Sequence, residues 1–254
     1  MTMEVRNLSF SYDNNRIIFS DVSFNLEKGV IFCILGANGS GKSTLLNCLV
    51  KLLKPKSGAI MLNGRDTREM TYKDIAQVVA YVPQTYSPSF DYAVRDFVVM
   101  GRAPYISTFQ RPKQADYSIA DEAIKMLKLD HLADRPYTQI SGGERQQVNI
   151  ARALVQQPEI IFFDEPTNHL DYGNQLRVLK LMKSFAKKGY AIIMTTHNPD
   201  HVILLEGKVG ILNQNGLMIT GDCSEILDEK RICDIYSKIK NGVCQRSKQN
   251  GSNI

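Results

Sequence analysis

The chain has 254 residues, of which 43% are apolar, and this suits one large α/β domain with a substantial core. Its formal net charge is +5, with Lys and Arg scattered singly and in pairs, so we expect a solvated surface and no nucleic-acid partner. No apolar run approaches the length that spans a bilayer, and the opening residues lack the features of a secretory signal.

The first third of the chain predicts an antiparallel β unit that leads into an α/β core. Val5–Phe10 and Ile17–Leu26 are strand-like and flank a turn-rich segment. Val30–Leu35 is a continuous apolar run, which is typical of a strand buried on both faces. A glycine-rich loop and a helix over about Lys42–Leu53 follow. Two more strands are expected at Ala59–Asn63 and Val78–Val82.

The middle of the chain differs in composition and predicts a helical insertion over about residues 85–157. It is rich in Pro, Tyr and Arg, and its clearest helix covers about Gln114–Lys128, with one apolar face. We expect one domain over residues 1–240 and a polar, flexible tail over residues 241–254. After the insertion the α/β pattern resumes, with strands at Ile160–Phe163 and Ala191–Thr195, a helix at Asn174–Lys187, and a hairpin of Val209–Asn213 with Leu217–Thr220.

The segment Gly36–Ser43, GANGSGKS, matches the P-loop pattern between a buried strand and a helix. Its glycines let backbone N–H groups wrap phosphate oxygens, and the helix N-terminus adds a favourable dipole. Lys42 is expected to reach the β- and γ-phosphates, and the Ser43 hydroxyl to bind Mg²⁺. The alternative is an ordinary glycine-rich turn, but the flanking elements favour a nucleotide site. We assign to this site Gly36, Asn38, Gly39, Ser40, Gly41, Lys42, Ser43 and Thr44.

Ile160–Glu165, IIFFDE, is an apolar strand that delivers two acids to its carboxyl end, where α/β sheets bind ligands. Asp164 is expected to hold Mg²⁺, and Glu165 to orient the attacking water and accept its proton. Taken alone, the run would better fit a capped strand end before Pro166. The P-loop upstream favours the catalytic interpretation.

Ser141–Glu144, SGGE, opens another helix. Its Ser-x-x-Glu spacing is that of a capping box, so an ordinary well-capped helix is a strong alternative. Two glycines in a first turn are nevertheless poor helix formers, and they fit a backbone that a phosphate approaches closely. One chain already has one phosphate site. A second anion site therefore suggests that two chains share each nucleotide.

Along the chain the P-loop comes first, SGGE second, and IIFFDE third, where it continues into FFDEPTNHLD. With its motifs in this order, the chain resembles the ABC ATPase family over about residues 3–228. These proteins are the nucleotide-binding subunits of ABC transporters. The resemblance implies a P-loop NTPase core with an N-terminal antiparallel β subdomain and an inserted helical subdomain. It also implies ATP hydrolysis with Mg²⁺, in which Ser141, Gly142, Gly143 and Glu144 contact the ATP of a second copy.

The family pattern extends to four further positions. Tyr12 falls where the family stacks an aromatic residue on adenine, although it could be a plain strand-face tyrosine. Gln84 matches a glutamine that reaches Mg²⁺ and the attacking water; the alternative is a surface residue after Pro83. Asp171 closes the NHLD loop that crosses the dimer interface. His197 matches the histidine that contacts the γ-phosphate and the catalytic glutamate.

A zinc site is a weaker interpretation of the histidines. His197 and His201 are four residues apart, but Pro199 lies between them and no Glu follows His197, as the HExxH pattern requires.

Val94–Tyr105, VRDFVVMGRAPY, resembles the helical subdomain of importers for metal chelates such as iron-siderophores, haem and cobalamin, with some oxyanion relatives. The resemblance implies a homodimer with ATP at its interface, two membrane-spanning permease subunits and, indirectly, a substrate-binding protein. It implies a peripheral place on the cytoplasmic face of the cell membrane. The main alternative is a soluble ABC ATPase, as in iron–sulfur cluster assembly. The residues alone suggest only that Phe97, Val98 and Met100 form an apolar face beside an exposed Arg102; the alternative is ordinary packing within the subdomain.

Overall fold

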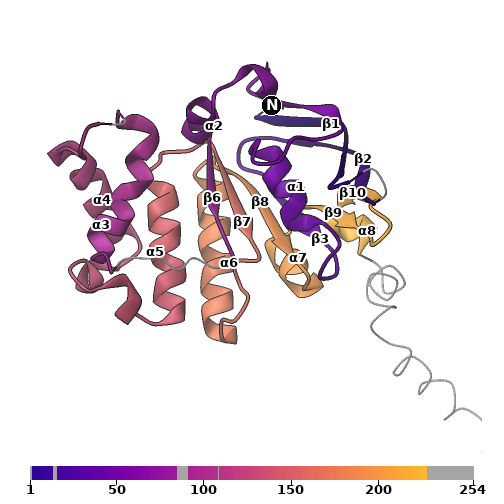
Figure 1. Cartoon of the computed structure of the whole chain (residues 1–254). Coiled ribbons are helices and arrows are strands. Elements are labelled where there is room, and N and C mark those ends of the chain that lie inside the picture. Colours follow the sequence, from indigo (N-terminus) through magenta and orange to yellow (C-terminus); the bar gives the residue numbers. More distant parts are fainter. Residues whose placement is uncertain (1, 14–15, 85–90, 108, 228–254) are drawn as a thin grey trace, which may run out of the picture.

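Two β-sheets with different strand pairing organise the chain in the computed structural model, which describes residues 2–13, 16–84, 91–107 and 109–227 (Figure 1). The smaller sheet is antiparallel and has the strand order β2-β1-β4-β5. Its strands are β1 (Met3–Ser11), β2 (Ile17–Leu26), β4 (Ser57–Leu62) and β5 (Arg65–Asp66). The predicted N-terminal antiparallel unit is therefore confirmed.

The larger sheet has the order β10-β9-β3-β8-β7-β6. All neighbours in it pair in parallel except β10, which runs antiparallel to β9. Its strands are β3 (Ile31–Leu35), β6 (Val79–Val82), β7 (Ile160–Asp164), β8 (Ala191–Thr196), β9 (Lys208–Leu212) and β10 (Met218–Asp222). Because β3, β7 and β8 are neighbours and parallel, the segments that follow them meet at one edge of the sheet.

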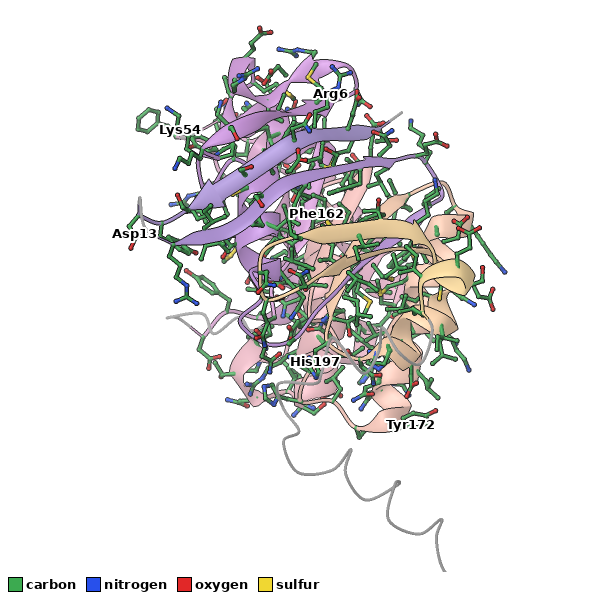
Figure 2. The ribbon with its side chains drawn as sticks, turned by 90° about the vertical axis from the view of Figure 1, so that its right-hand side faces the viewer. Arg6, Asp13, Lys54, Phe162, Tyr172 and His197 are labelled. Atoms are coloured by element: carbon green, nitrogen blue, oxygen red, sulfur yellow. The ribbon has the colours of Figure 1, made fainter. Side chains whose placement is uncertain are left out.

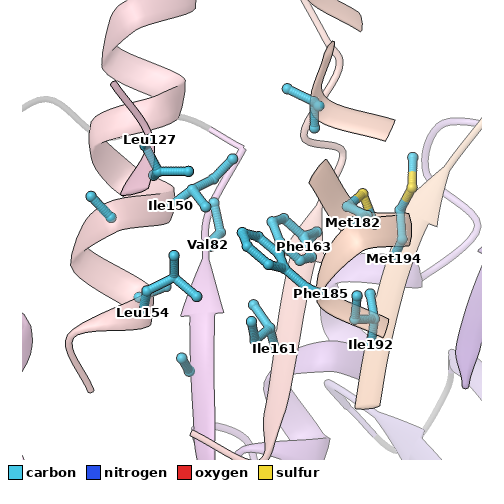
Figure 3. Close-up of a cluster of buried hydrophobic side chains, with 14 of the residues drawn as sticks. Val82, Leu127, Ile150, Leu154, Ile161, Phe163, Met182, Phe185, Ile192 and Met194 are labelled. Atoms are coloured by element: carbon cyan, nitrogen blue, oxygen red, sulfur yellow. The ribbon is translucent and has the colours of Figure 1, made fainter. Parts of the chain in front are cut away.

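Successive side chains of the central strands enter two different cores. In β3, Cys33 and Leu35 join the cluster beneath the helices, whereas Phe32 and Ile34 join the cluster shared with the small sheet. A strand buried on both faces needs this unbroken apolar run, as predicted for β3. Figure 3 shows the first cluster, in which Phe163 of β7 lies near Phe185 of a covering helix.

Helices cover both faces of the large sheet. On the side of the small sheet lies α1 (Lys42–Leu49), whose apolar residues enter the second core. The other face is covered by α6 (Tyr172–Lys187) and by the last of the helices between β6 and β7, against which the longer of the others pack. Those helices are α3 (Val94–Val99), η2 (Met100–Tyr105), α4 (Gln114–Met126), η3 (Asp130–Leu132), η4 (Tyr137–Gln139) and α5 (Gly142–Leu154). They stand together beside β6 (Figure 1), and the predicted α/β class with a helical insertion is confirmed.

The expected apolar face beside an exposed Arg102 is wrong. Phe97 and Val98 are fully buried among the inserted helices, and Arg102 is only 7% exposed. Its guanidinium donates from Nη1 to the carbonyl of Val155 at 2.8 Å and pairs with Asp116 at 3.2 Å. This burial follows from the packing of η2 directly against the end of α5. The limits of the helical subdomain, residues 85–157, stay a prediction.

One predicted helix end is wrong, and further short helices complete the fold. The helix α1 ends at Leu49 and not at Leu53, because Lys51 adopts a φ of 62° and donates from Nζ to the carbonyl of Met70. Two short helices were not predicted: α2 (Tyr72–Val78) and α7 (Pro199–Leu205). The chain also forms η1 (Thr67–Glu69) and α8 (Cys223–Ile226).

The predicted tail, residues 241–254, lies outside the described residues. None of the helices in the described ranges combines the length and the apolar composition that a bilayer crossing requires.

Candidate functional site

The loop Gly36–Thr44 joins β3 to α1 and encloses its own lysine. Lys42 is 4% exposed, and its Nζ donates to the carbonyls of Gly36 at 2.9 Å and Ala37 at 3.1 Å. A Cβ at Gly36 would lie 2.5 Å from the carbonyl oxygen of Leu212, and Gly41 has a φ of 100°, so both positions require glycine. The hydroxyl of Ser40 is buried and has no partner among the described residues. These features fit a loop that cradles an oxyanion.

Asp164 lies at the end of β7, beneath this loop. Its carboxylate accepts hydrogen bonds from Ser43 Oγ at 3.0 Å, Thr195 Oγ1 at 2.6 Å and Tyr81 OH at 2.9 Å. Burial, together with the adjacent Asp164, raises the pKa of the Tyr81 hydroxyl, so this group stays a donor. Neither Thr195 nor Tyr81 was predicted, because their role depends on neighbouring strands placing them beside β7.

Glu165 follows directly and faces the lysine of the loop. Its Oε1 lies 3.0 Å from Lys42 Nζ, its Oε2 accepts from Asn168 Nδ2, and Oε2 lies 3.4 Å from His197 Nδ1. The backbone of Glu165 has a φ of 45°, a conformation that costs energy in a non-glycine residue and recurs at functional sites.

Burial disfavours the charged form of Glu165, but the hydrogen bond and positive charge of Lys42, with the amide of Asn168, outweigh it and lower the pKa of the carboxyl. The Glu165 side chain is therefore a carboxylate at neutral pH. It can accept a proton from a water molecule that lies within hydrogen-bonding distance of it.

A cavity of about 970 Å³ opens above these side chains. Tyr12, Gln84, Glu165 and His197 line it together with most of the loop, namely Asn38, Gly39, Gly41, Lys42, Ser43 and Thr44, so the structure brings these predicted residues together. Gly36, Ser40 and Asp164 lie behind this wall and do not line the cavity. Tyr12 is 66% exposed, but its hydroxyl lies 3.1 Å from Thr44 Oγ1 and its ring packs edge-on against Phe10. Residues that were not predicted, among them Asp13, Arg16, Thr167, Gln175 and His201, also line the cavity.

Ser141–Glu144 and Asp171 do not line this cavity. Ser141 caps α5 in a capping box: its Oγ accepts from Glu144 N at 3.3 Å, and its N–H donates to Glu144 Oε2 at 2.8 Å. The Oγ–H of Ser141 also donates to Glu144 Oε2 at 2.7 Å, and this bond, followed by that of the Ser141 N–H, lowers the pKa of the Glu144 carboxyl. Asp171 caps α6 by accepting from Asn174 N at 2.9 Å. Both caps occupy helix starts, and Gly142 is exposed, with no atom within 4 Å of the place of a Cβ.

The two histidines face different partners. His197 directly follows β8 and turns to Glu165, whereas His201 lies in α7, which begins at Pro199, so they do not share one helix face. In Figure 2, His197 lies at the same end of the molecule as Tyr172, the first residue of α6, and away from Arg6. The loops after β7 and β8 therefore meet at this end.

A family profile described as "ABC transporter" matches residues 19–168. The molybdate import ATP-binding protein MolC of Haemophilus influenzae is 37% identical over 92% of this chain and 87% of that protein. An ATP-binding protein of Helicobacter pylori named for iron chelatin transport is 36% identical over 82% of this chain and 85% of that protein. A solved chain of an inward-facing, metal-chelate type ABC transporter is 37% identical, with a TM-score of 0.84 over 93% of this chain and 88% of that chain.

Proposed function

Because this chain belongs to the ABC transporter family, as one of its ATP-binding and ATP-hydrolysing proteins, we propose that it energises an importer for a metal chelate. The observation that carries the proposal is the meeting of Lys42, Glu165 and His197 on one cavity wall beside the phosphate loop. The relatives named above are transport proteins, so the soluble alternative in iron–sulfur cluster assembly is not favoured.

The predicted residues of the cavity divide the hydrolysis of ATP among them. The loop N–H groups and Lys42 bind the β- and γ-phosphates, and Tyr12 offers its exposed ring to the adenine. Glu165 orients the attacking water and takes its proton, as its ionised state at neutral pH allows. His197 contacts the γ-phosphate and steadies Glu165 from 3.4 Å. Gln84, on the wall after β6, helps to orient the water.

The same edge of the sheet fits Mg²⁺. The Ser43 hydroxyl and the Asp164 carboxylate are 3.0 Å apart, and such oxygen groups are the donors that this ion prefers. We assign Ser43, Asp164 and Gln84 to hold it. When bound, Mg²⁺ neutralises negative charge on the phosphates. Tyr81 and Thr195 keep the Asp164 carboxylate in position for this role.

A second copy of the chain completes the site. Ser141 and Gly142 are exposed at the start of α5, away from the cavity, so they are available to the nucleotide of a partner copy. Asp171 caps the adjacent helix, whose Asn174 lies 2.9 Å from the Cβ position of Gly143. In the head-to-tail homodimer, each ATP lies between Gly36–Thr44 of one copy and Ser141–Glu144 of the other. ATP closes the dimer and hydrolysis opens it.

The partners and cargo follow the named relatives. Two membrane-spanning permease subunits receive the motion through the helical subdomain, and a substrate-binding protein acts indirectly. The chain sits peripherally on the cytoplasmic face of the cell membrane. An iron, haem or cobalamin chelate is the cargo, as for the relative named for iron chelatin; the molybdate relative makes an oxyanion the second candidate.

The test is purification of the tagged chain from detergent-solubilised membranes, followed by reconstitution of the captured complex in vesicles. We expect a multi-span membrane protein in the complex and ATP-dependent uptake of a metal chelate. Uptake of molybdate alone overturns the chelate cargo. A complex that contains only soluble proteins overturns the transport function.

A further inference from the structure

One buried histidine in the cavity wall, His201, has no part in the hydrolysis described above. His201 is 6% exposed, and four other polar side chains surround its ring. A buried polar ring is retained at low cost only when its nitrogens are hydrogen-bonded. The partners of each ring nitrogen therefore indicate what the ring does.

Each nitrogen of His201 meets groups from two different segments. Nδ1 lies 3.2 Å from Thr167 Oγ1, in the loop after β7, and 3.5 Å from Thr196 Oγ1, at the end of β8. Nε2 lies 3.3 Å from Gln175 Oε1, on α6, and 3.3 Å from Asn198 Nδ2, at the start of α7. The ring thus bridges the segment that follows Glu165 and the segment that follows His197.

The loop after β7 is tied to this ring at two points. Thr167 stands between Glu165 and Asn168, the residue whose amide holds Glu165 Oε2. Gln175 donates from Nε2 to the carbonyl of Leu170 at 2.9 Å, in the same loop. A shift of the ring would therefore displace this loop and, through Asn168, the carboxylate of Glu165.

The loop after β8 is tied to the ring through Asn198. Its backbone N–H donates to Thr196 Oγ1 at 3.0 Å, and its Oδ1 accepts from Asp200 N at 2.9 Å, so Nδ2 must face His201. Asn198 is the next residue after His197. From these contacts we propose that His201 is a positioning residue, which holds Glu165 and His197 at the separation that hydrolysis requires. The inference rests on the proposed roles of those two residues.

The two neutral tautomers of His201 make different hydrogen bonds at Nε2. Gln175 is fixed as an acceptor and Asn198 as a donor, and both face Nε2, which can satisfy only one of them at a time. One neutral tautomer donates to Gln175, on the Glu165 side, and the other accepts from Asn198, on the His197 side. Burial lowers the pKa of His201, so the neutral ring that has this choice prevails at neutral pH.

The test compares three substitutions in the full-length chain, with ATP turnover, ATP affinity and thermal unfolding measured for each. His201→Leu removes both nitrogens, His201→Gln keeps a polar group near the position of Nε2, and His201→Asn keeps one near Nδ1. We expect His201→Leu to lower kcat about tenfold, because small misplacements of catalytic groups cost rate, while affinity for ATP changes less than about twofold. The His201→Gln and His201→Asn variants each keep the contacts of one ring nitrogen, so we expect both to hydrolyse ATP at rates between those of the parent and His201→Leu.

A purely structural role predicts a different pattern. If His201→Leu loses turnover only in proportion to its unfolded fraction, or if all three variants match the parent, the inference is overturned. If His201→Leu fails to fold, the His201→Gln and His201→Asn variants provide the test. A kcat equal to that of the parent in both variants overturns the inference. Glu165→Gln is measured alongside. Normal turnover in Glu165→Gln refutes the proposed base, whereas an inactive Glu165→Gln beside unaffected His201 variants refutes only this inference.

Discussion

The Nζ atom of Lys42 lies 3.0 Å from Oε1 of Glu165, and the two side chains are only 4% and 10% exposed. Lys42 also donates to the carbonyls of Gly36 and Ala37, so all three of its donors have acceptors inside the chain. The lysine that is proposed to bind phosphate and the carboxylate that is proposed to activate water therefore neutralise each other. A triphosphate must compete with Glu165 for the ammonium group. Its binding would release the carboxylate toward the water that it activates.

Glu165→Gln is expected to bind ATP at least as tightly as the parent and to lose turnover by a factor of about 10²–10⁴, the usual contribution of a general base. Its amide cannot take the proton of water, and it holds Lys42 less strongly than a carboxylate does. Turnover, nucleotide affinity and the size of the ATP-bound species are measured together, and a closed dimer should accumulate. Glu206→Gln is the matched control, because Glu206 lies at the C-terminal end of α7 with an 80% exposed side chain and should turn over normally. Normal turnover in Glu165→Gln would remove this residue from the role of base.

The ion pair of Lys42 and Glu165 should also appear in the pH dependence of stability. The pKa of Glu165 is lower in the folded chain than in the unfolded chain, so the charged carboxylate stabilises the fold at pH values above the ordinary carboxyl pKa. That contribution disappears as the pH falls through the folded pKa. We expect the difference in the free energy of unfolding between the parent and Glu165→Gln to stay level from pH 7 down to about pH 5 and to shrink as the pH falls below the ordinary carboxyl pKa of 4.5. A difference that stays constant or grows in acid contradicts this account.

Ser141→Arg tests the shared site. The substitution adds a bulky cation at the exposed start of α5 and removes the Oγ that accepts from Glu144 N. Because Ser141 does not line the cavity of its own chain, ATP should still bind to Gly36–Thr44, while turnover falls to background. Nucleotide affinity and turnover are measured on the same preparation, with thermal unfolding as the check on the lost cap. If isolated monomers of the variant hydrolyse ATP at the parent rate, the shared-site arrangement is wrong.

The sequence predicted the parts of this molecule that depend on local patterns. The unbroken apolar run of β3 and the P-loop glycines are readable because a single strand and a single turn impose them. The short helices α2 and α7 also have local signals in the sequence, namely the Thr71–Asp74 capping box and Pro199 directly after the capping Asn198.

Contacts between residues of different elements could not be predicted from local sequence patterns. Thr195 and Tyr81 reach Asp164 only because β8 and β6 flank β7 in the sheet. Arg102 is charged and was expected at the surface. Its burial depends on the carbonyl of Val155 and on Asp116, which are distant in the sequence. A single sequence does not encode those neighbours in any local spacing.

Gly101 makes the packing of the inserted helices testable. A Cβ at this position would lie 2.1 Å from the carbonyl oxygen of Arg152 and 2.5 Å from Cγ2 of Val155, so Gly101→Ala must push η2 away from α5. Overpacking of this kind costs about 1–3 kcal/mol. Each kcal/mol lowers Tm by roughly 2–4 °C in a chain of this size. Gly142→Ala is the control for stability, because nothing lies within 4 Å of its Cβ position, and its Tm should stay within about 1 °C of the parent or rise slightly. Equal unfolding temperatures for Gly101→Ala and Gly142→Ala would mean that η2 does not pack tightly against α5. The packing of η2 against α5 would then no longer explain why Arg102 is buried.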